Sequence, residues 1–121
     1  MEWDHPEIKN LKKQISKFHR QFIKEAVGIA FKAPRVRIRC WCNVMRKGDQ
    51  IKAHKHESYN RTSPVKHLCG HLSVQVDGST STYYEGSPIL NKNGQMTFFP
   101  AHTFHWTDRY ENDRERITVP F

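Results

Sequence analysis

Two stretches decide the fold of this chain, Gly48-Asp-Gln-Ile-Lys-Ala-His-Lys-His56 and Gly94-Gln-Met-Thr-Phe-Phe-Pro-Ala-His-Thr-Phe-His105. Residues two apart on a β-strand point to the same face, so His54 and His56 can present both imidazoles to one ion. His105 follows about fifty residues later, on a separate strand, and would supply the third ligand. Three imidazoles on one side leave the opposite positions of a metal open, which is what metal catalysis requires.

Length and composition predict a single domain. The chain has 121 residues, of which 36% are hydrophobic and 12% aromatic, enough for one packed core and too few residues for a second domain. We expect one domain over 1–121, with a helix over about 5–27 and a β-structure over about 34–121.

The formal net charge of +8 favours an anionic partner, and nucleic acid is one such partner. The basic residues are spread along the chain, with no basic block and no nucleic-acid-binding signature. We therefore interpret them mainly as a solvated surface, and nucleic-acid binding remains a minor hypothesis.

The cysteines indicate a reducing compartment. Cys40, Cys42 and Cys69 are odd in number, form no Cys-x-x-Cys motif, and follow no signal peptide or long apolar run. This pattern predicts a cytoplasmic protein without a membrane span. Cys40 and Cys42 share one strand face, and we interpret them as small buried residues and not as metal ligands.

The pattern of apolar residues changes from a helical to a strand period along the chain. From Pro6 to Val27 apolar residues recur every three to five positions, which predicts an amphipathic helix whose apolar stripe packs on the outside of a sheet. From Val36 to Cys42 they alternate with polar residues, as in a half-buried strand. Gly86-Ser-Pro88 is typical of a turn. Further strands are expected at Ile51–His56, Leu68–Val76, Thr82–Tyr84, Gln95–Phe99, Phe104–Asp108 and Arg116–Phe121.

One helix followed by about seven or eight short antiparallel strands predicts a mainly β fold. The arrangement that best fits is a jelly roll, or double-stranded β-helix, whose two sheets enclose a pocket with the histidines at its mouth. A plain β-sandwich would show the same number of strands and remains an alternative.

The two histidine stretches carry a family resemblance. Gly48-x5-His54-x-His56 resembles the first cupin motif, and Gly94-x5-Pro100-x4-His105 resembles the second. The chain is more similar still to a small branch of the double-stranded β-helix oxygenases that depend on Fe(II) and 2-oxoglutarate. That similarity covers roughly Arg37 to Phe121. It is carried by Trp41-Cys-Asn43, Gly48-Asp49, His54-Lys-His56, Phe99-Pro100, His105 and Arg116-Ile-Thr-Val-Pro-Phe121.

The resemblance implies a metal and a co-substrate. It implies that His54, His56 and His105 bind Fe(II), and that Arg116 holds the distal carboxylate of 2-oxoglutarate. Thr118 would share the strand face of Arg116 and could donate a hydroxyl to the same carboxylate.

The roles of other residues are left open by the sequence. Asn43 and Tyr84 are weaker candidates for contacts with the co-substrate, as is Tyr83. Without the resemblance, Arg116 can equally be read as a surface charge that pairs with Glu115 or Asp113.

The metal-binding pair departs from the usual oxygenase pattern. Most oxygenases of this superfamily have His-x-Asp or His-x-Glu, whereas Lys55 here separates two histidines, so an all-histidine triad is predicted. Glu57 would face away from the site on a regular strand. The remaining strand and turn histidines, His67, His71 and His102, are interpreted as polar residues without a metal-binding role, although His71 or His102 could line the pocket entrance.

Three functions are compatible with these residues. The first is a non-haem iron dioxygenase that uses 2-oxoglutarate to oxidise a small-molecule or unidentified substrate. The second is a metal-binding cupin of another type, a thiol dioxygenase or an isomerase, in which Arg116 is incidental. The third is a non-catalytic sandwich that binds a small molecule or nucleic acid through its basic surface. Sheets of this kind can pair at their edges, so a homodimer is also considered.

Overall fold

The structure is a computed structural model that describes residues 4–27, 37–56 and 68–121. The chain divides into two compact units, residues 1–39 and 40–121. The single-domain organisation and the packing of the helix on a sheet stay predictions. The elements are α1 (Pro6–Val27), β1 (Asn43–Met45), β2 (Leu68–Gln75), β3 (Ser81–Tyr84), β4 (Ser87–Leu90), β5 (Met96–Pro100), β6 (His105–Thr107) and β7 (Arg116–Pro120).

The first unit contains α1, and its bounds agree with the predicted amphipathic helix. Ile15 and Ile23, eight positions apart and therefore on one face, are each 3% exposed. Phe18, between them, is 39% exposed. Within the described residues, no helix has both the length and the apolar character needed to cross a membrane.

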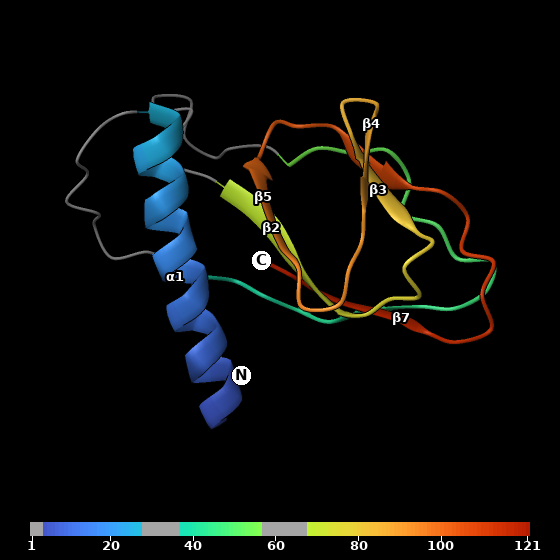
Figure 1. Ribbon diagram of the computed structural model, residues 1–121, viewed down its shortest axis with the longest axis horizontal. Coiled ribbons are helices and arrows are strands. Elements are labelled where there is room, and N and C mark those ends of the chain that lie inside the picture. Colours follow the sequence, from blue (N-terminus) through green and yellow to red (C-terminus); the bar gives the residue numbers. More distant parts are fainter. Residues whose placement is uncertain (1–3, 28–36, 57–67) are drawn as a thin grey trace. The chain divides into compact units, whose positions relative to one another are not determined.

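The second unit consists of two antiparallel sheets, with the strand orders β1-β7-β2-β5 and β4-β3-β6 (Figure 1). Residues 51–54 run antiparallel to β6: the Thr107 amide donates to the Ile51 carbonyl at 3.0 Å. His54 and His105 exchange both backbone hydrogen bonds, at 3.2 and 3.0 Å. This segment therefore lies beside β6 as a fourth, extended segment of the smaller sheet. Each sheet then interleaves early and late strands, which is the order of a jelly roll and confirms the predicted mainly β, cupin-like fold.

The inner faces of the two sheets are unusually polar. Among the described residues of this unit, buried polar side chains outnumber buried apolar ones. The buried polar residues are His71, Ser73, Thr82, Asn91, His105, Thr107, Arg116 and Thr118, and the buried apolar ones are Met45, Val76, Phe99, Ala101 and Tyr110. Because burying a polar group without a partner costs free energy, such an interior indicates that ligand binding, and not core packing alone, determines its residues.

Two predicted elements are wrong in detail. Residues 37–42 form no strand, and β1 begins only at Asn43, while Val36 lies outside the described residues. The stretch predicted only as a turn contains β4, and the turn itself is formed by Glu85 and Gly86, both with positive φ. Pro88 is accommodated because β4 is an edge strand of its sheet.

The inward face of β2 is also not the one that hydrophobicity suggests. Leu72, Val74 and Val76 were expected to share a face, yet Val74 is 49% exposed and Val76 is 7% exposed. A register shift between Ser73 and Gln75 breaks the alternation. As a result, His71 and Ser73 are the residues of β2 that point into the interior.

Candidate metal centre

The candidate site is a cavity of about 80 Å³ between the two sheets of the second unit. Its lining includes His54 and His56 from the segment beside β6, His105 on β6, and Arg116 and Thr118 on β7 of the larger sheet. The fold therefore brings the three histidines close to Arg116 and Thr118, although His54 and Arg116 lie more than sixty positions apart in the sequence.

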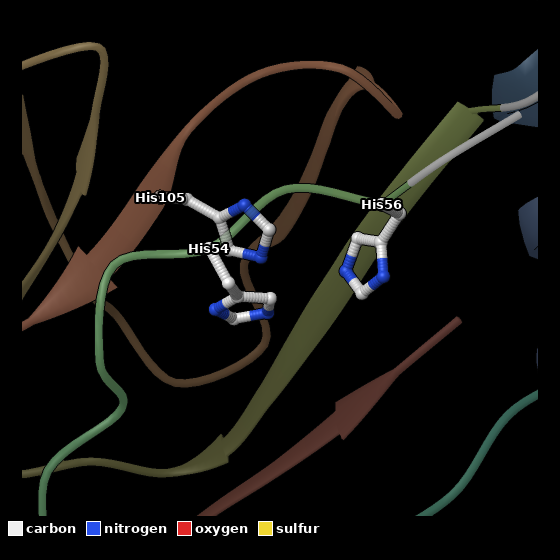
Figure 2. A group of neighbouring side chains, drawn as sticks. All are labelled: His54, His56 and His105. Atoms are coloured by element: carbon white, nitrogen blue, oxygen red, sulfur yellow. The ribbon is translucent and has the colours of Figure 1, made fainter.

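The three histidines converge (Figure 2), and their candidate ligand atoms all lie within 4.8 Å of one another. The ring centroids are 4.2 Å apart for His54 and His105, 5.1 Å for His54 and His56, and 5.2 Å for His56 and His105. In the parts of the chain that the structure describes, no other group of three or more His, Cys, Asp or Glu residues is spaced in this way. Lys55 points away, its Nζ lying 5.2 Å from the centre of the Phe104 ring.

Backbone carbonyls set the tautomers of two of these histidines. Nδ1 of His54 lies 2.8 Å from the Lys52 carbonyl oxygen, and Nδ1 of His105 lies 2.9 Å from that of Thr103. A carbonyl oxygen can only accept, so each Nδ1 carries the proton and donates it. The Nε2 lone pairs of both rings are then free, which is the state that a metal-ligating histidine requires.

The protonation state fits the same role. Burial, and secondarily the neighbouring His54, lowers the pKa of His56 below its ordinary value. Burial also lowers the pKa of His105, against an opposing effect of the Thr103 carbonyl. Both shifts favour the neutral imidazole at pH 7, and only the neutral ring has a lone pair to give to a metal.

Arg116 is buried at the bottom of the same cavity, with only 2% of its surface exposed. Its Nη1 lies 3.2 Å from Sδ of Met45, and its Nη2 donates to Oγ1 of Thr82 at 3.4 Å. The Nε atom is buried and has no hydrogen-bond partner. Burial lowers the pKa of Arg116, because desolvation disfavours the charged form.

The reading of Arg116 as a surface charge is wrong. Glu115 pairs instead with Arg46 at 2.9 Å, and Asp113 pairs with Lys47 at 3.0 Å. No described acidic side chain forms a salt bridge with Arg116. The Asp77 carboxylate attracts Arg116 from a distance, but a buried guanidinium without a direct salt bridge is still costly.

Arg116 lines a second, larger cavity of about 430 Å³ as well. Asp77, Asp108 and Glu111 line that cavity, whereas no described Asp or Glu lines the one that contains the histidines. An anion would be repelled by these carboxylates, so the histidine cavity is the more favourable place for it.

The other predicted contact residues divide into two groups. Thr118 and Asn43 are directly paired across β7 and β1, and both line the histidine cavity. Tyr84 is not among the residues that line the cavity, and its hydroxyl lies 3.2 Å from Nδ1 of His71. The Tyr83 hydroxyl is turned elsewhere and donates to Asp108 at 2.7 Å.

His71, which the sequence analysis allowed to line the pocket entrance, is only 8% exposed and lines the cavity. Trp41, 45% exposed, also lines it, and the sequence pointed to this residue only through the family resemblance. His102 is exposed and does not line the cavity, and His67 lies outside the described residues.

All three cysteines are free thiols that form no disulfide bond. Cys42 is exposed and Cys40 is half-buried, so the interpretation of both as buried residues is wrong for Cys42. Cys69 lines the cavity, and burial raises the pKa of its thiol, which keeps it protonated at neutral pH.

His71 should make stability depend on pH. Burial, followed by the charge of Arg116, lowers the pKa of His71 from 6.5 to about 4, against a smaller opposing effect of Asn91. Between these values the unfolded chain binds the proton and the folded one does not, so stability falls as pH falls from about 6.5 to 4. We expect the wild type to lose about 2 to 3 kcal/mol more than His71→Gln between pH 7 and pH 4.5, measured by urea unfolding. Because other histidines also titrate here, the difference between the two proteins is the informative quantity, and parallel curves would contradict the prediction.

Comparisons with known proteins found matches among solved structures but not among family models or curated proteins. No protein-family model matches the chain. No curated protein matches it either. Among solved structures, an RmlC-like cupin from Shewanella frigidimarina NCIMB 400 matches 67% of this chain at 17% identity with a TM-score of 0.48. KdgF from Halomonas sp. also matches 67%, at 23% identity with a TM-score of 0.47. This chain spans 60% and 64% of the lengths of those two chains, and its fold is assigned from its own strand order.

Proposed function

We propose that this protein is a non-haem Fe(II) dioxygenase that uses 2-oxoglutarate to oxidise a small substrate. The observation that carries the proposal is the combination, in one cavity, of three converging histidines with a buried arginine that forms no salt bridge to a described residue. The histidines offer ligands for a metal, and the arginine offers a counter-charge for a carboxylate.

The histidine ligands fit a divalent transition metal. The Nε2 lone pairs of His54 and His105 are freed by the carbonyls of Lys52 and Thr103, and imidazole suits iron as a ligand. Three protein ligands leave coordination positions for a co-substrate. When bound there, Fe(II) supplies the activation of dioxygen, which is coupled to the oxidative decarboxylation of 2-oxoglutarate to succinate and carbon dioxide.

The residues of the chain bind and orient the co-substrate. The Arg116 guanidinium attracts the distal carboxylate, and its unpartnered Nε–H is a donor that the protein itself does not use. Thr118, 2% exposed on the same face of β7, adds a hydroxyl donor. Asn43 on β1 is the register partner of Thr118 on the neighbouring strand β7, and its Oδ1 accepts from Nε1 of Trp41 at 3.1 Å. This leaves the Asn43 amide group available to the ligand.

The test is a spectroscopic titration without oxygen. Addition of Fe(II) and then 2-oxoglutarate to the full chain should produce the weak visible charge-transfer band of the chelate. Admission of oxygen should then yield succinate. Succinate added in place of 2-oxoglutarate has no keto group and serves as the control for the band. Iron-loaded protein that gives neither band nor succinate would exclude the proposal.

A second candidate is a metal-dependent cupin of another type, such as a thiol dioxygenase or an isomerase. The all-histidine ligand set favours it, because no Asp or Glu joins the histidine cluster among the described residues. In this case Arg116 would be dispensable for activity. The two candidates therefore predict different effects on activity when Arg116 is substituted.

A further inference from the structure

His71 is a fourth histidine in the cavity, but it does not belong to the metal cluster. It lies on β2, is 8% exposed, and lines the cavity together with Arg116 of the neighbouring strand β7. Its ring is not within ligand distance of the other three, which form their own group. Its chemistry therefore has to be explained separately.

One nitrogen of His71 has a partner and the other does not. Nδ1 lies 3.2 Å from the Tyr84 hydroxyl, whereas Nε2 is buried and forms no direct hydrogen bond within the described residues. The amide oxygen of Asn91 accepts from the Thr82 hydroxyl at 3.2 Å, and the Asn91 side chain also acts on His71, whose pKa it raises against the larger effect of burial. A buried polar atom left in this way normally binds a water or a ligand.

The hydrogen bond between the Tyr84 hydroxyl and Nδ1 of His71 is compatible with either atom as donor. Burial raises the pKa of Tyr84, so the phenol keeps its proton at neutral pH and can donate it to Nδ1 of His71. Burial, followed by the Arg116 charge, lowers the pKa of His71, so the ring is neutral and holds a single proton. In the tautomer in which Nδ1 accepts from Tyr84, that proton is on Nε2.

In that tautomer, His71 and Arg116, which both line the cavity, carry two N–H donors that bond no described residue, Nε2–H and Nε–H. They come from adjacent, hydrogen-bonded strands. No described Asp or Glu lines the cavity to accept from them. Two donors, one of them cationic, match the oxygens of a carboxylate.

We infer that His71 is a specificity-determining residue whose Nε2–H donates to the carboxylate held by Arg116, selecting a carboxylic acid over a neutral ligand of the same size. The inference rests on the proposed function for the choice of ligand, a short dicarboxylate or keto acid. It goes further in giving a role to the His71–Tyr84 pair, which acts as a tautomer-fixed donor.

The test uses succinate as the probe, because succinate lacks the keto group through which 2-oxoglutarate would bind a metal. In the metal-free full chain, nitrogen NMR of the imidazoles should show His71 protonated on Nε2, and titration with succinate should shift that resonance. An Nδ1-protonated ring, or no binding of succinate to the wild type, would overturn the inference. Both readouts use the unsubstituted protein and are independent of how any variant folds.

Variants then measure the size of the effect by calorimetry. His71→Leu removes the donor and should weaken succinate binding by about 10- to 100-fold, the loss typical of a hydrogen bond to a charged group. His71→Gln places an N–H near the position of Nε2 and should stay within about 3-fold of the wild type. His102→Leu, the same change at an exposed histidine, is the matched control and should have no effect. Equal affinity of His71→Leu and the wild type would overturn the inference.

The outcomes separate this inference from the proposed function. If succinate binds through His71 but the iron-loaded protein never consumes 2-oxoglutarate, the proposed function fails and the role of His71 stands. If 2-oxoglutarate is consumed and His71→Leu binds it as tightly as the wild type, the role of His71 fails and the proposed function stands.

Discussion

Replacement of His105 by alanine is expected to weaken the binding of Fe(II) or Zn(II) by about 100-fold or more. Structural zinc sites have apparent binding free energies of about 10–16 kcal/mol shared among about four ligands, so one ligand contributes roughly 3 kcal/mol. His105 should be the most sensitive of the three, because it is buried and its Nδ1 is fixed by the Thr103 carbonyl at 2.9 Å. Calorimetry or competition with a coloured chelator measures the loss.

His102→Ala is the matched control for this prediction. His102 lies three positions before His105, is exposed, and does not line the cavity, so its removal should leave metal affinity within about 2-fold. A thermal melt gives a second readout. Metal at about 1,000 times its dissociation constant should stabilise the wild type by about 4 kcal/mol and stabilise His105→Ala much less. Unchanged affinity and stoichiometry in His105→Ala would show that the histidine cluster is not a metal site.

Arg116→Met is expected to weaken the binding of 2-oxoglutarate to the metal-loaded protein by about 100-fold while leaving the protein as stable or more stable. The affinity falls because truncating one partner of a buried charge pair costs about 2–5 kcal/mol. The stability does not fall because the wild-type cation is buried without a salt bridge to any described residue, and an apolar side chain of similar length removes its desolvation cost. Binding is measured by anaerobic titration and stability by urea unfolding.

Two further variants sharpen the result. Arg114→Met makes the same change at an exposed arginine that bonds the Gln75 side chain at 2.9 Å, and it should alter neither quantity appreciably. Arg116→Lys keeps the charge but loses the planar fork, so its affinity should lie between those of the wild type and Arg116→Met. If Arg116→Met keeps its affinity for 2-oxoglutarate and its activity, the second candidate, a cupin of another type, is favoured. A large loss of stability would instead assign Arg116 a structural role.

Part of the site could be predicted because it depends on local spacing. The His-x-His pair needs only an extended backbone to place both rings on one side, and residues 51–56 are extended enough to bridge β6 at His54. The period-two pattern also located β2, β3, β5, β6 and β7 within a few residues of their observed bounds. The helix over Pro6–Val27 followed from its apolar period in the same way.

Elsewhere the rule that apolar residues point inward failed. On β2 it selected Leu72, Val74 and Val76, whereas the bulge after Ser73 and the polar interior bring His71 inside. On β4 the Gly86-Ser-Pro88 signal hid a strand, because an edge position lets Pro88 do without a backbone donor. The first failure lies at the polar interior, whereas the second lies on an edge strand that is exposed along its whole length.

By itself, the sequence determined the helix, the jelly-roll class and the three histidines, because each follows from periodicity or from spacing between neighbours in the chain. Only the tertiary structure showed that Arg116 forms no salt bridge with Glu115 or Asp113, its acidic neighbours in the sequence, because these pair with Arg46 and Lys47. It also decided the role of His71, whose free nitrogen depends on Tyr84 from the opposite sheet. The physical reason is that burial and hydrogen-bond partners depend on contacts between distant segments, and these set whether a charge or a donor is left for a ligand.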